Sequence, residues 1–586
     1  MSTSLIGLGG ALAALSFSAA PASAQSTQQA DEEDYDAVIV TGMRIRQGGA
    51  QDANHFRSIS LDGDSIELPR ASSFTVEGLM GEHDLTLPAN KACEQLFCIN
   101  AQSMRASLPA EPDSTVFVGL GFESGAKPEN YTSIPISIVA VVDRSGSMSG
   151  APITRAKEGL QAALGMMRPG DRMGIVVYGS KTNVHLPVTD VEGNRDAISE
   201  AIDTIAINGA TYMEAGMKLG YATAMEELEH SNGKTRMLLF SDENANVGNT
   251  DADGFMGQAN RGAAAGIGLT SIGVGRIFDG ALATKISSVP GGNLFFVDKE
   301  GDAAKLFEKE FFNMSSEVAR NIEITIAPAK GFKVAEVYGV PADIITRASD
   351  GSVTATIGSA FMSSKGGGIF ATLSGNGSGA STANVAISYE DLKTGEREND
   401  TARVAALDAN PAAPLVKAHL LVDQYTAITG ALNASHRKDD PLAAQASLAD
   451  LEDRVRASGI AGMERELELI AGLRGKAGKL AALASNPAIY RARKAVGEWR
   501  VLAHRGVDDV ARGDLITITD DGEFITENGG NGPNSGDEIY QEYEINGRQI
   551  QIKEGRLVMD YTINGDRMRM RNPVEGTMLL LERDDT

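Results

Sequence analysis

The residues with the clearest chemical potential in this sequence are three hydroxyls and two carboxylates that follow apolar runs. The stretch "ISIVAVVDRSGSMSG" places Asp143 directly after an aliphatic run, with Ser145 and Ser147 at alternate positions behind it. Thr211 lies in "GATYMEAG" at the start of a helical pattern, and Asp242 follows the run "RMLLF". All five side chains offer oxygen, the donor that hard divalent cations such as Mg²⁺ prefer.

The surrounding residues 134–318 predict the element that would position these side chains. Near-continuous apolar runs such as "RMGIVVYG" and "GIGLTSIGVG" alternate with amphipathic helical patterns. Such runs are typical of strands that are buried on both faces of a parallel sheet, so we predict a doubly wound, Rossmann-like α/β domain. Ligands bind such sheets at the carboxyl ends of strands, and Asp143, Thr211 and Asp242 should therefore meet at one rim. A cation held there mainly by hydroxyls stays electron-poor and gains from one further carboxylate supplied from outside.

The same five residues resemble the metal-ion-dependent adhesion site (MIDAS) of von Willebrand factor type A (VWA) domains. The resemblance implies that Ser145, Ser147 and Thr211 are metal ligands. It also implies that Asp143 and Asp242 hold metal-bound water or ligate the metal directly. The implied cofactor is Mg²⁺, with Mn²⁺ or Ca²⁺ as alternatives, and the implied partner is a protein ligand that presents an Asp or Glu to the metal.

Segments rich in β patterns flank the α/β domain on both sides. Residues 56–133 and residues 319–405 contain short runs such as "STVFVGLGF" and "ANVAISY", which are typical of strands. The first flank alone is short for a sandwich, so we expect the two flanks to pair into one β-sandwich with the α/β domain inserted between two of its strands. The alternative is two independent small β units. Residues 56–405 together resemble bacterial exported proteins that carry a VWA domain between β segments.

The C-terminal part of the chain changes character twice. Residues 414–505 are rich in Ala, Leu, Glu and Arg and predict a helical hairpin. Residues 513–586 return to β patterns, and "YEINGRQIQI" and "YTINGDRMRM" each contain Asn-Gly, a strong signal for tight hairpins. We therefore expect a small antiparallel β-rich module at this end.

The N-terminal part predicts export. Residues 1–24 contain a short apolar run that ends in small residues, which is typical of a signal peptide. Residues 25–55 are polar and acidic and predict a disordered arm. Within this arm "DAVIVTGMRIRQGG" resembles the N-terminal segment of TonB-dependent receptors, which implies a peptide that adds a strand to an outer-membrane or TonB-related partner. The alternative is a plain tethering linker. We expect an exported protein that is periplasmic, outer-membrane-associated or on the cell surface.

Cysteine usage and charge add two further expectations. Cys93 and Cys98 are the only cysteines, and in an oxidising compartment a pair this close most simply forms a local disulfide. The alternative is two buried free thiols. The formal net charge of −25 argues against nucleic acid and anionic membranes as main partners. No run after the signal peptide is long and apolar enough to predict an integral membrane span.

Motifs for catalysis are missing from this sequence. Dehalogenase-type phosphatases need the motif D-x-D after the strand. In this sequence Ser145 occupies the position of the second Asp, so the general acid/base is missing. The stretch "GSMSG" has Met148 at the centre where a nucleophile elbow has serine. The sequence also lacks H-E-x-x-H and a phosphate-binding G-x-x-x-x-G-K-[ST] loop. We therefore predict a metal-dependent protein-binding or adhesion module of the cell envelope and no enzyme. The alternative is a structural or assembly factor for an outer-membrane complex, with a vestigial metal site.

Overall fold

The computed structural model of the chain describes residues 53–583 with short gaps. The gaps are 64–65, 90–91, 126–133, 231–232, 243–251, 275–288, 298, 362–366, 378, 406–409, 486–493, 506–509, 520–522, 528–537, 547–548, 553–556, 565–566 and 573–575. The predicted signal peptide, the TonB-receptor-like stretch and nearly all of the predicted arm lie outside the described residues.

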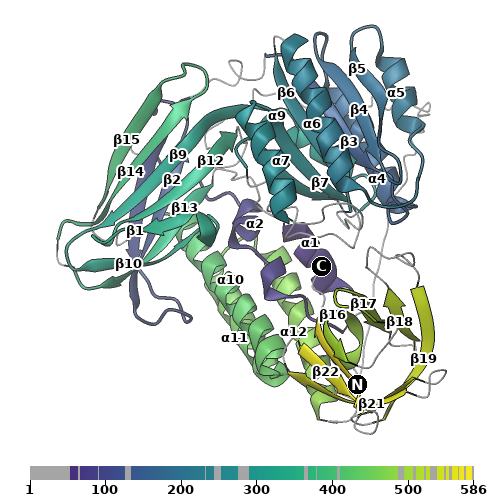
Figure 1. Cartoon of the computed structure of the whole chain (residues 1–586). Coiled ribbons are helices and arrows are strands. Elements are labelled where there is room, and N and C mark those ends of the chain that lie inside the picture. The colour runs from purple at the N-terminus through teal and green to yellow at the C-terminus, as the bar shows by residue number, and fades with distance from the viewer. Residues whose placement is uncertain are drawn as a thin grey trace, which may run out of the picture. The chain divides into compact units, whose positions relative to one another are not determined.

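A six-stranded sheet forms the α/β part of the chain, with strand order β5-β4-β3-β6-β7-β8 (Figure 1). Its strands are β3 Ile136–Asp143, β4 Arg172–Tyr178, β5 Asn183–Asp190, β6 Lys234–Ser241, β7 Gly268–Val274 and β8 Gly292–Val297. All neighbours are parallel except β4 and β5, which are antiparallel. The chain passes from β3 to β4 on one side and continues with β6 on the other side of β3. The carboxyl end of β3 is therefore the switch point, the place where such sheets bind ligands.

Helices cover both faces of this sheet, as a doubly wound fold requires. They are α4 Ala151–Met166, α5 Arg195–Asp203, α6 Met213–His230, α7 Ala252–Ala264 and α9 Asp302–Ser315. The side chains of β3 divide between two cores. Ile138 and Val142 lie in a core with residues of α4, α5 and α9, whereas Val139 and Val141 lie in a core with residues of α6 and α7. Burial on both faces explains why the strand sequence is continuously apolar.

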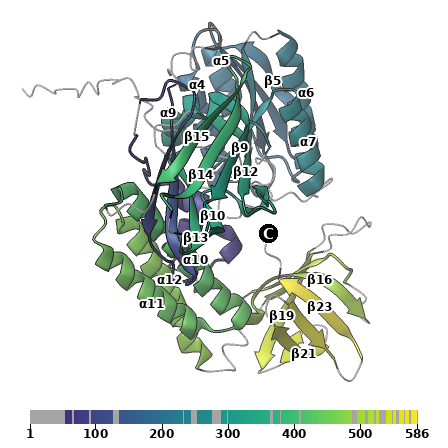
Figure 2. The same ribbon diagram turned by 90° about the vertical axis from the view of Figure 1, so that its left-hand side faces the viewer.

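The two β flanks form one sandwich, and the α/β part is inserted in it. One sheet has the order β1-β2-β13-β10 and the other the order β11-β12-β9-β14-β15 (Figure 2). The strands are β1 Cys98–Arg105, β2 Ser114–Glu123, β9 Glu317–Pro328, β10 Phe332–Tyr338, β11 Ile345–Arg347, β12 Val353–Phe361, β13 Gly368–Gly375, β14 Ser381–Asp391 and β15 Arg397–Ala405. Strand β2 precedes the insertion and pairs with β13, which follows it. This pairing and a shared core of both sheets confirm the predicted insertion.

The first 30 described residues differ from the expectation of β structure for 56–133. They contain helices α1 Ala53–Leu61 and α2 Val76–Gly81. Helix α1 packs against α12 Glu464–Ala484 and α2 packs against α10 Ala413–Lys438, while α11 Pro441–Ser458 packs against both of these long helices. Phe56, Phe74 and Leu79 are buried in one core with these three long helices. The prediction of strands here was wrong because short apolar runs do not reveal whether their burial partner is a sheet or a distant helix. Within its described residues, the C-terminal helical region has the three long helices α10, α11 and α12 in place of the expected hairpin of two.

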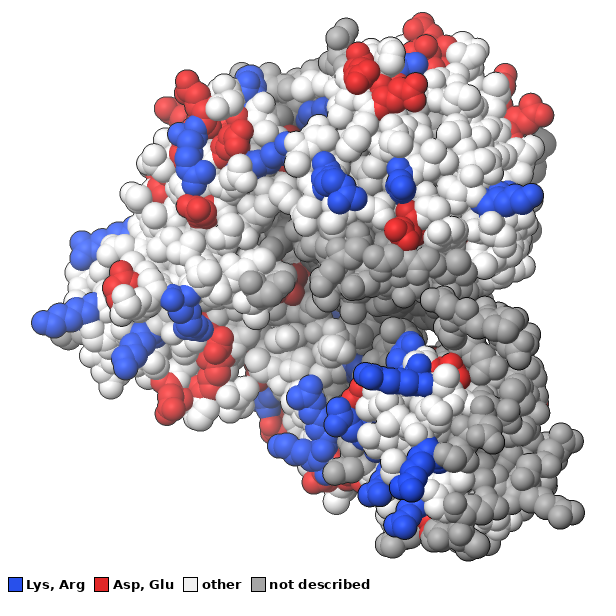
Figure 3. Space-filling view, in the orientation of Figure 1, with Lys and Arg blue, Asp and Glu red and all other residues white. Residues whose placement is uncertain are grey.

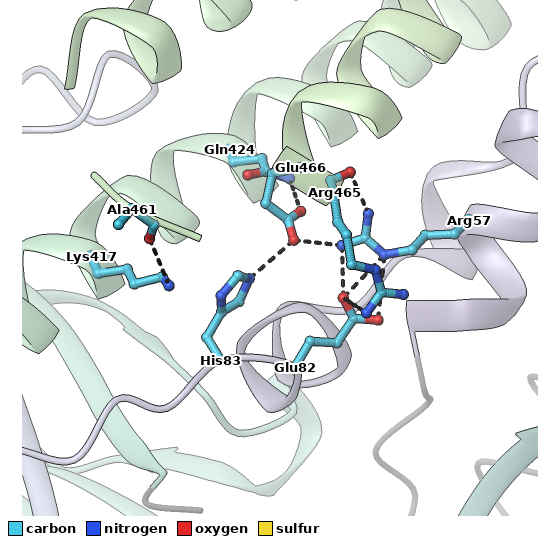
Figure 4. A network of polar contacts seen from close by, with 8 residues as sticks. All are labelled: Arg57, Glu82, His83, Lys417, Gln424, Ala461, Arg465 and Glu466. Carbon is cyan, nitrogen blue, oxygen red and sulfur yellow. Dashed lines mark hydrogen bonds and ion pairs between the residues drawn. The ribbon is translucent and has the colours of Figure 1, made fainter. Parts of the chain in front are cut away.

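A buried polar network joins the N-terminal helices to α12 (Figure 4). Arg57 of α1 donates to Glu466 of α12 at 2.6 Å and to Glu82 at 2.8 Å. Glu466 is fully buried and also accepts hydrogen bonds from His83 and Gln424, at 3.0 and 2.7 Å. The network supplies the donors that a buried carboxylate needs.

The C-terminal strands close into an eight-stranded antiparallel barrel. Its strands are β16 Gly497–Arg505, β17 Leu515–Ile518, β18 Glu523–Glu527, β19 Glu538–Asn546, β20 Gln549–Ile552, β21 Leu557–Asn564, β22 Arg567–Arg571 and β23 Met578–Arg583. The prediction of helix for 414–505 was therefore wrong for its last nine residues. Strand β16 is needed to close the barrel, because it pairs with both β17 and β23.

The structure also describes the cysteine pair and the apolarity of the helices. A disulfide joins Cys93 to Cys98, the first residue of β1, and their Cα atoms lie 5.7 Å apart. Among the helices that the structure describes, none has the length and apolarity needed to cross a membrane.

Candidate metal centre

The carboxylate of Asp143 is held at the switch point of the α/β sheet. All eight residues of β3 are buried, and Asp143 is its last residue. Asp143 Oδ1 accepts the backbone N–H of Ser145 at 2.8 Å, and Oδ2 accepts the hydroxyl of Ser241 at 3.0 Å. Each carboxylate oxygen has a second lone pair, so this fixed carboxylate can still accept from water or ligate a cation.

The hydroxyls of Ser145 and Ser147 lie side by side in the loop after β3. Their Oγ atoms are 3.0 Å apart. Ser145 is buried and Ser147 is exposed, so the pair opens toward solvent on one side. Neighbouring oxygens around an octahedral Mg²⁺ with bonds of about 2.1 Å are about 3 Å apart. The observed spacing therefore fits two adjacent ligands of one ion.

Thr211 is carried by the loop before α6, which is hydrogen-bonded to the loop after β3. The N–H of Gly146 donates to the carbonyl of Gly209 at 2.6 Å, and the N–H of Asn208 donates to the carbonyl of Arg144 at 2.6 Å. Thr211 follows two residues after Gly209 and is 1 % exposed. The two backbone bonds bring its segment against the serine loop, although 64 residues separate Thr211 from Ser147 in the sequence.

A third loop, after β4, positions the Thr211 segment. The hydroxyl of Ser180 accepts the N–H of Ala210 at 3.0 Å, and the N–H of Ser180 donates to the carbonyl of Asn208 at 2.8 Å. The side chain of Asn208 accepts the N–H of Lys181 at 3.2 Å. Sequence reasoning missed Ser180 and Asn208. In the sequence, Ser180 is marked only as a small polar residue after the strand "GIVVYG". Asn208 is marked only by the Asn-Gly pair that it forms before Thr211.

Asp242 follows β6 and is 3 % exposed. Burial raises the pKa of Asp143 to about 6, and the nearby charge of Asp242 also raises it, whereas hydrogen bonds from Ser145 and Ser241 lower it. The two carboxylates are thus close enough to repel each other in a poorly solvated place. Such a pair is stabilised by a cation between or beside them.

The five residues singled out in the sequence therefore gather at one rim of the sheet. Direct hydrogen bonds connect Asp143, Ser145 and Ser147, the charge of Asp242 acts on Asp143, and backbone bonds hold the Thr211 segment. Within the described ranges no three His, Cys, Asp or Glu side chains cluster as a metal-binding group.

The family of the inserted domain follows from comparison with known sequences. The sequence model of the von Willebrand factor type A domain family matches residues 137–309. This part of the chain is a VWA domain. The match covers the strands of the six-stranded sheet, except the first residue of β3, and all five residues of the rim.

Parts of this chain are also similar to known proteins of bacteria and animals. The uncharacterized protein YfbK of Escherichia coli strain K12 is 28% identical over 228 residues, which are 38% of this chain and 39% of YfbK. The inter-alpha-trypsin inhibitor heavy chain H1 of Bos taurus is 24% identical over 203 residues, which are 34% of this chain and 22% of that protein. The matches thus span less than half the length of either relative.

Solved structures show similar VWA proteins. A von Willebrand factor type A protein from Catenulispora acidiphila has a TM-score of 0.44 and 13% identity, and the match covers 68% of this chain and 98% of that chain. Proximal thread matrix protein 1 from the mussel byssus, whose MIDAS motif is occupied by zinc, has a TM-score of 0.28 and 15% identity, with 32% and 49% covered.

Proposed function

We propose that the VWA domain binds a divalent cation, Mg²⁺ in the first place, and through it an acidic side chain of a protein partner. The observation that carries this proposal is the 3.0 Å spacing of the Ser145 and Ser147 hydroxyls beside the buried carboxylate of Asp143. Mn²⁺ and Ca²⁺ are the alternative ions, since both accept oxygen ligands.

The five residues of the rim have two proposed roles, coordination of the cation and balance of its charge. Ser145, Ser147 and Thr211 are the proposed direct ligands, and all three are neutral. Asp143 and Asp242 hold metal-bound water or ligate the metal directly. Because the two carboxylates repel each other, a bound cation would stabilise them. A bound cation would supply an electrophilic position that an incoming carboxylate completes.

Exposed apolar side chains flank the proposed metal site and suit a protein partner. Ile207 is 39 % exposed and Tyr212 is 38 % exposed, and both lie within four positions of Thr211. Large apolar side chains at this level of exposure are contact points in protein interfaces, where aromatic residues are enriched. A partner that approaches the cation with an Asp or Glu would bury them.

The proposal places this binding at the cell envelope, after export. The N-terminal apolar run that resembles a signal peptide and the Cys93–Cys98 disulfide support this location. The outer-membrane or TonB-related partner suggested by "DAVIVTGMRIRQGG" remains part of the same proposal.

Calorimetric titration of the full chain with Mg²⁺, Mn²⁺ and Ca²⁺ tests the metal site. The variants are Asp143→Ala and Ser147→Ala, with Ser149→Ala as the matched control, because Ser149 is an exposed serine of the same loop outside the proposed ligand set. We expect wild type and Ser149→Ala to bind the ion and to gain stability, about 2.7 kcal/mol at a hundredfold excess over Kd. Asp143→Ala and Ser147→Ala should lose both effects.

Capture from envelope extracts tests the partner. A protein retained by wild type with Mg²⁺, released by chelator and absent from Asp143→Ala supports metal-dependent binding. If no ion binds in the titration, the metal site is vestigial, and the alternative function as a structural or assembly factor is favoured. If the ion binds but capture is unaffected by chelator, the acidic-partner part of the proposal is wrong.

A further inference from the structure

The outer wall of the C-terminal barrel carries a concentrated positive charge. Strand β22 reads "RMRMR", and its two methionines, Met568 and Met570, are fully buried inside the barrel. Arg567, Arg569 and Arg571 alternate with them and are exposed on the outside. In Figure 3 lysine and arginine side chains gather over the part of the barrel that this view shows.

The pairing of β22 with β23 places two apolar side chains, Met578 and Leu580, beside these arginines. Arg571 lies opposite Met578, and Arg569 lies opposite Leu580. Met578 and Leu580 are both partly exposed. Arg567 lies opposite Glu582 and forms an ion pair with it at 3.0 Å.

The register of β23 with β16 adds a second column of arginines on the far side. Arg505 lies opposite Met578, and Arg500 lies opposite Glu582, both exposed. Neighbouring strands are about 4.8 Å apart, so the two arginine columns are separated by about 10 Å with Met578 and Leu580 between them. We call this surface the arginine wall; it consists of Arg500, Arg505, Arg567, Arg569 and Arg571.

Ion pairs between described residues account for only part of the charge of the arginine wall. Among the described residues, no ion pair is formed by Arg505, Arg569 or Arg571. In the part of the chain that the structure describes, the acids beside the wall other than Glu582 are Asp560, which lies opposite Arg571 and accepts a hydrogen bond from Gln549, and Glu498 on β16. Among the described residues, strand pairing and strand alternation place three acids, Glu582, Glu498 and Asp560, beside the five arginines, in a chain that carries a formal charge of −25.

The shape of this surface selects among anionic partners. The outside of a closed barrel is convex. A closed barrel also has no free strand edge to which an acidic peptide could add a strand. The outward positions of the wall and its central column lack the aromatic side chains on which nucleic-acid bases stack. A planar anionic surface can bind a protein that offers no concave pocket, no free strand edge and no aromatic side chains for stacking.

We infer that the arginine wall binds an anionic lipid surface whose headgroups carry phosphate. Guanidinium groups bind phosphate through paired N–H donors, and Met578 and Leu580 lie where they meet the boundary between headgroups and acyl chains. The negative charge of the whole chain does not prevent this contact. Salt screens charges beyond about 8–10 Å, so the local arginines decide the interaction once the wall is at the surface.

Cosedimentation of the full chain with lipid vesicles tests the inference. The probes are vesicles of phosphatidylglycerol and, as the neutral comparison, vesicles of phosphatidylcholine. The test variant is Arg505→Glu/Arg569→Glu/Arg571→Glu. The control is Lys333→Glu/Lys393→Glu/Arg403→Glu, which makes the same change of charge at exposed positions of the sandwich. A milder variant with Gln at the three wall positions covers the case in which the charge reversal disturbs the barrel.

We expect binding to phosphatidylglycerol and not to phosphatidylcholine, weakened by raising NaCl from about 50 to about 500 mM. The test variant should lose about a hundredfold in vesicle affinity, the Gln variant should lose at least about tenfold, and the control should bind as wild type. Equal binding to both lipids, equal loss in the control, or full binding by the folded Gln variant would overturn the inference. Binding of heparin, RNA or an acidic protein without vesicle binding would also overturn it, because the wall would then serve another class of anion.

Discussion

Arg57 and Glu466 are 409 positions apart in the sequence, and their side chains form a buried ion pair with 2.6 Å between Nη2 and Oε1. The pair shows that the helical part of this protein is discontinuous. Helix α1 precedes the sandwich and the VWA domain, yet it packs on α12, which follows both. The sandwich strands and the VWA domain are thus placed, in the sequence, between two segments that form one helical core.

Replacement of Glu466 by alanine should destabilise the helical part strongly. The change leaves Arg57, which is 5 % exposed, without its buried partner, and removal of one member of a buried pair costs about 3–5 kcal/mol. Glu464→Ala is the control on the same helix, because Glu464 is exposed. Urea unfolding followed by circular dichroism measures both. Losses of equal size in the two variants would contradict the role assigned to the network.

The same network predicts a loss of stability in acid. Burial alone raises the pKa of Glu466, but the hydrogen bond from His83, the charge of Arg57 and the hydrogen bond from Gln424 outweigh it and lower the pKa to about 2. A carboxyl whose pKa is lowered on folding contributes stability above its unfolded value, and this contribution disappears as the pH falls from about 4.5 to about 2. Unfolding curves of wild type over this range should show a steeper decline than those of Glu466→Gln. Parallel curves would show that Glu466 is not the group responsible.

Ser180→Ala and Asn208→Ala should weaken metal binding without touching the proposed ligands. Their side chains accept the N–H groups of Ala210 and Lys181, so each variant loosens the loop that carries Thr211. Loss of such a supporting contact typically costs about 10–100-fold in metal affinity. Calorimetric titration with Mg²⁺ measures the effect.

Asn194→Ala is the control for these loop variants. Asn194 hydrogen-bonds the carbonyls of Asp190 and Glu192 in the turn before α5, so its loss should leave metal affinity unchanged. Unchanged affinity in Ser180→Ala and Asn208→Ala would mean that the backbone bonds alone hold the Thr211 segment.

Removal of the disulfide should have a modest and local effect. Cys93 and Cys98 are five positions apart, and closing so short a loop stabilises by about 2 kcal/mol in the chain-entropy account. We expect Cys93→Ser to shift the melting temperature of the sandwich slightly while the VWA domain still binds Mg²⁺. A loss of metal binding in this variant would show a coupling that the structure does not indicate.

The sequence by itself determined the VWA domain and the composition of its rim. Continuous apolar runs mark strands buried on both faces, and the parallel order brings their carboxyl ends together, so the site of Asp143, Thr211 and Asp242 could be read from pattern alone. The insertion in a sandwich could also be inferred, because residues 56–133 alone are short for a sandwich. These properties depend on the period and length of local runs, which one sequence displays.

Only the tertiary structure decided which distant segments bury one another. Phe56 and Phe74 lie against helices more than 300 residues away, and β16 is a strand because it closes the barrel with β23. The contacts of Ser180 with the Thr211 loop are of the same kind. Strand register also created the arginine wall, because Arg505 and Arg571 flank Met578 only through pairing. Net charge averages over the whole chain, whereas contact with a surface depends on the charges within a few ångströms of it.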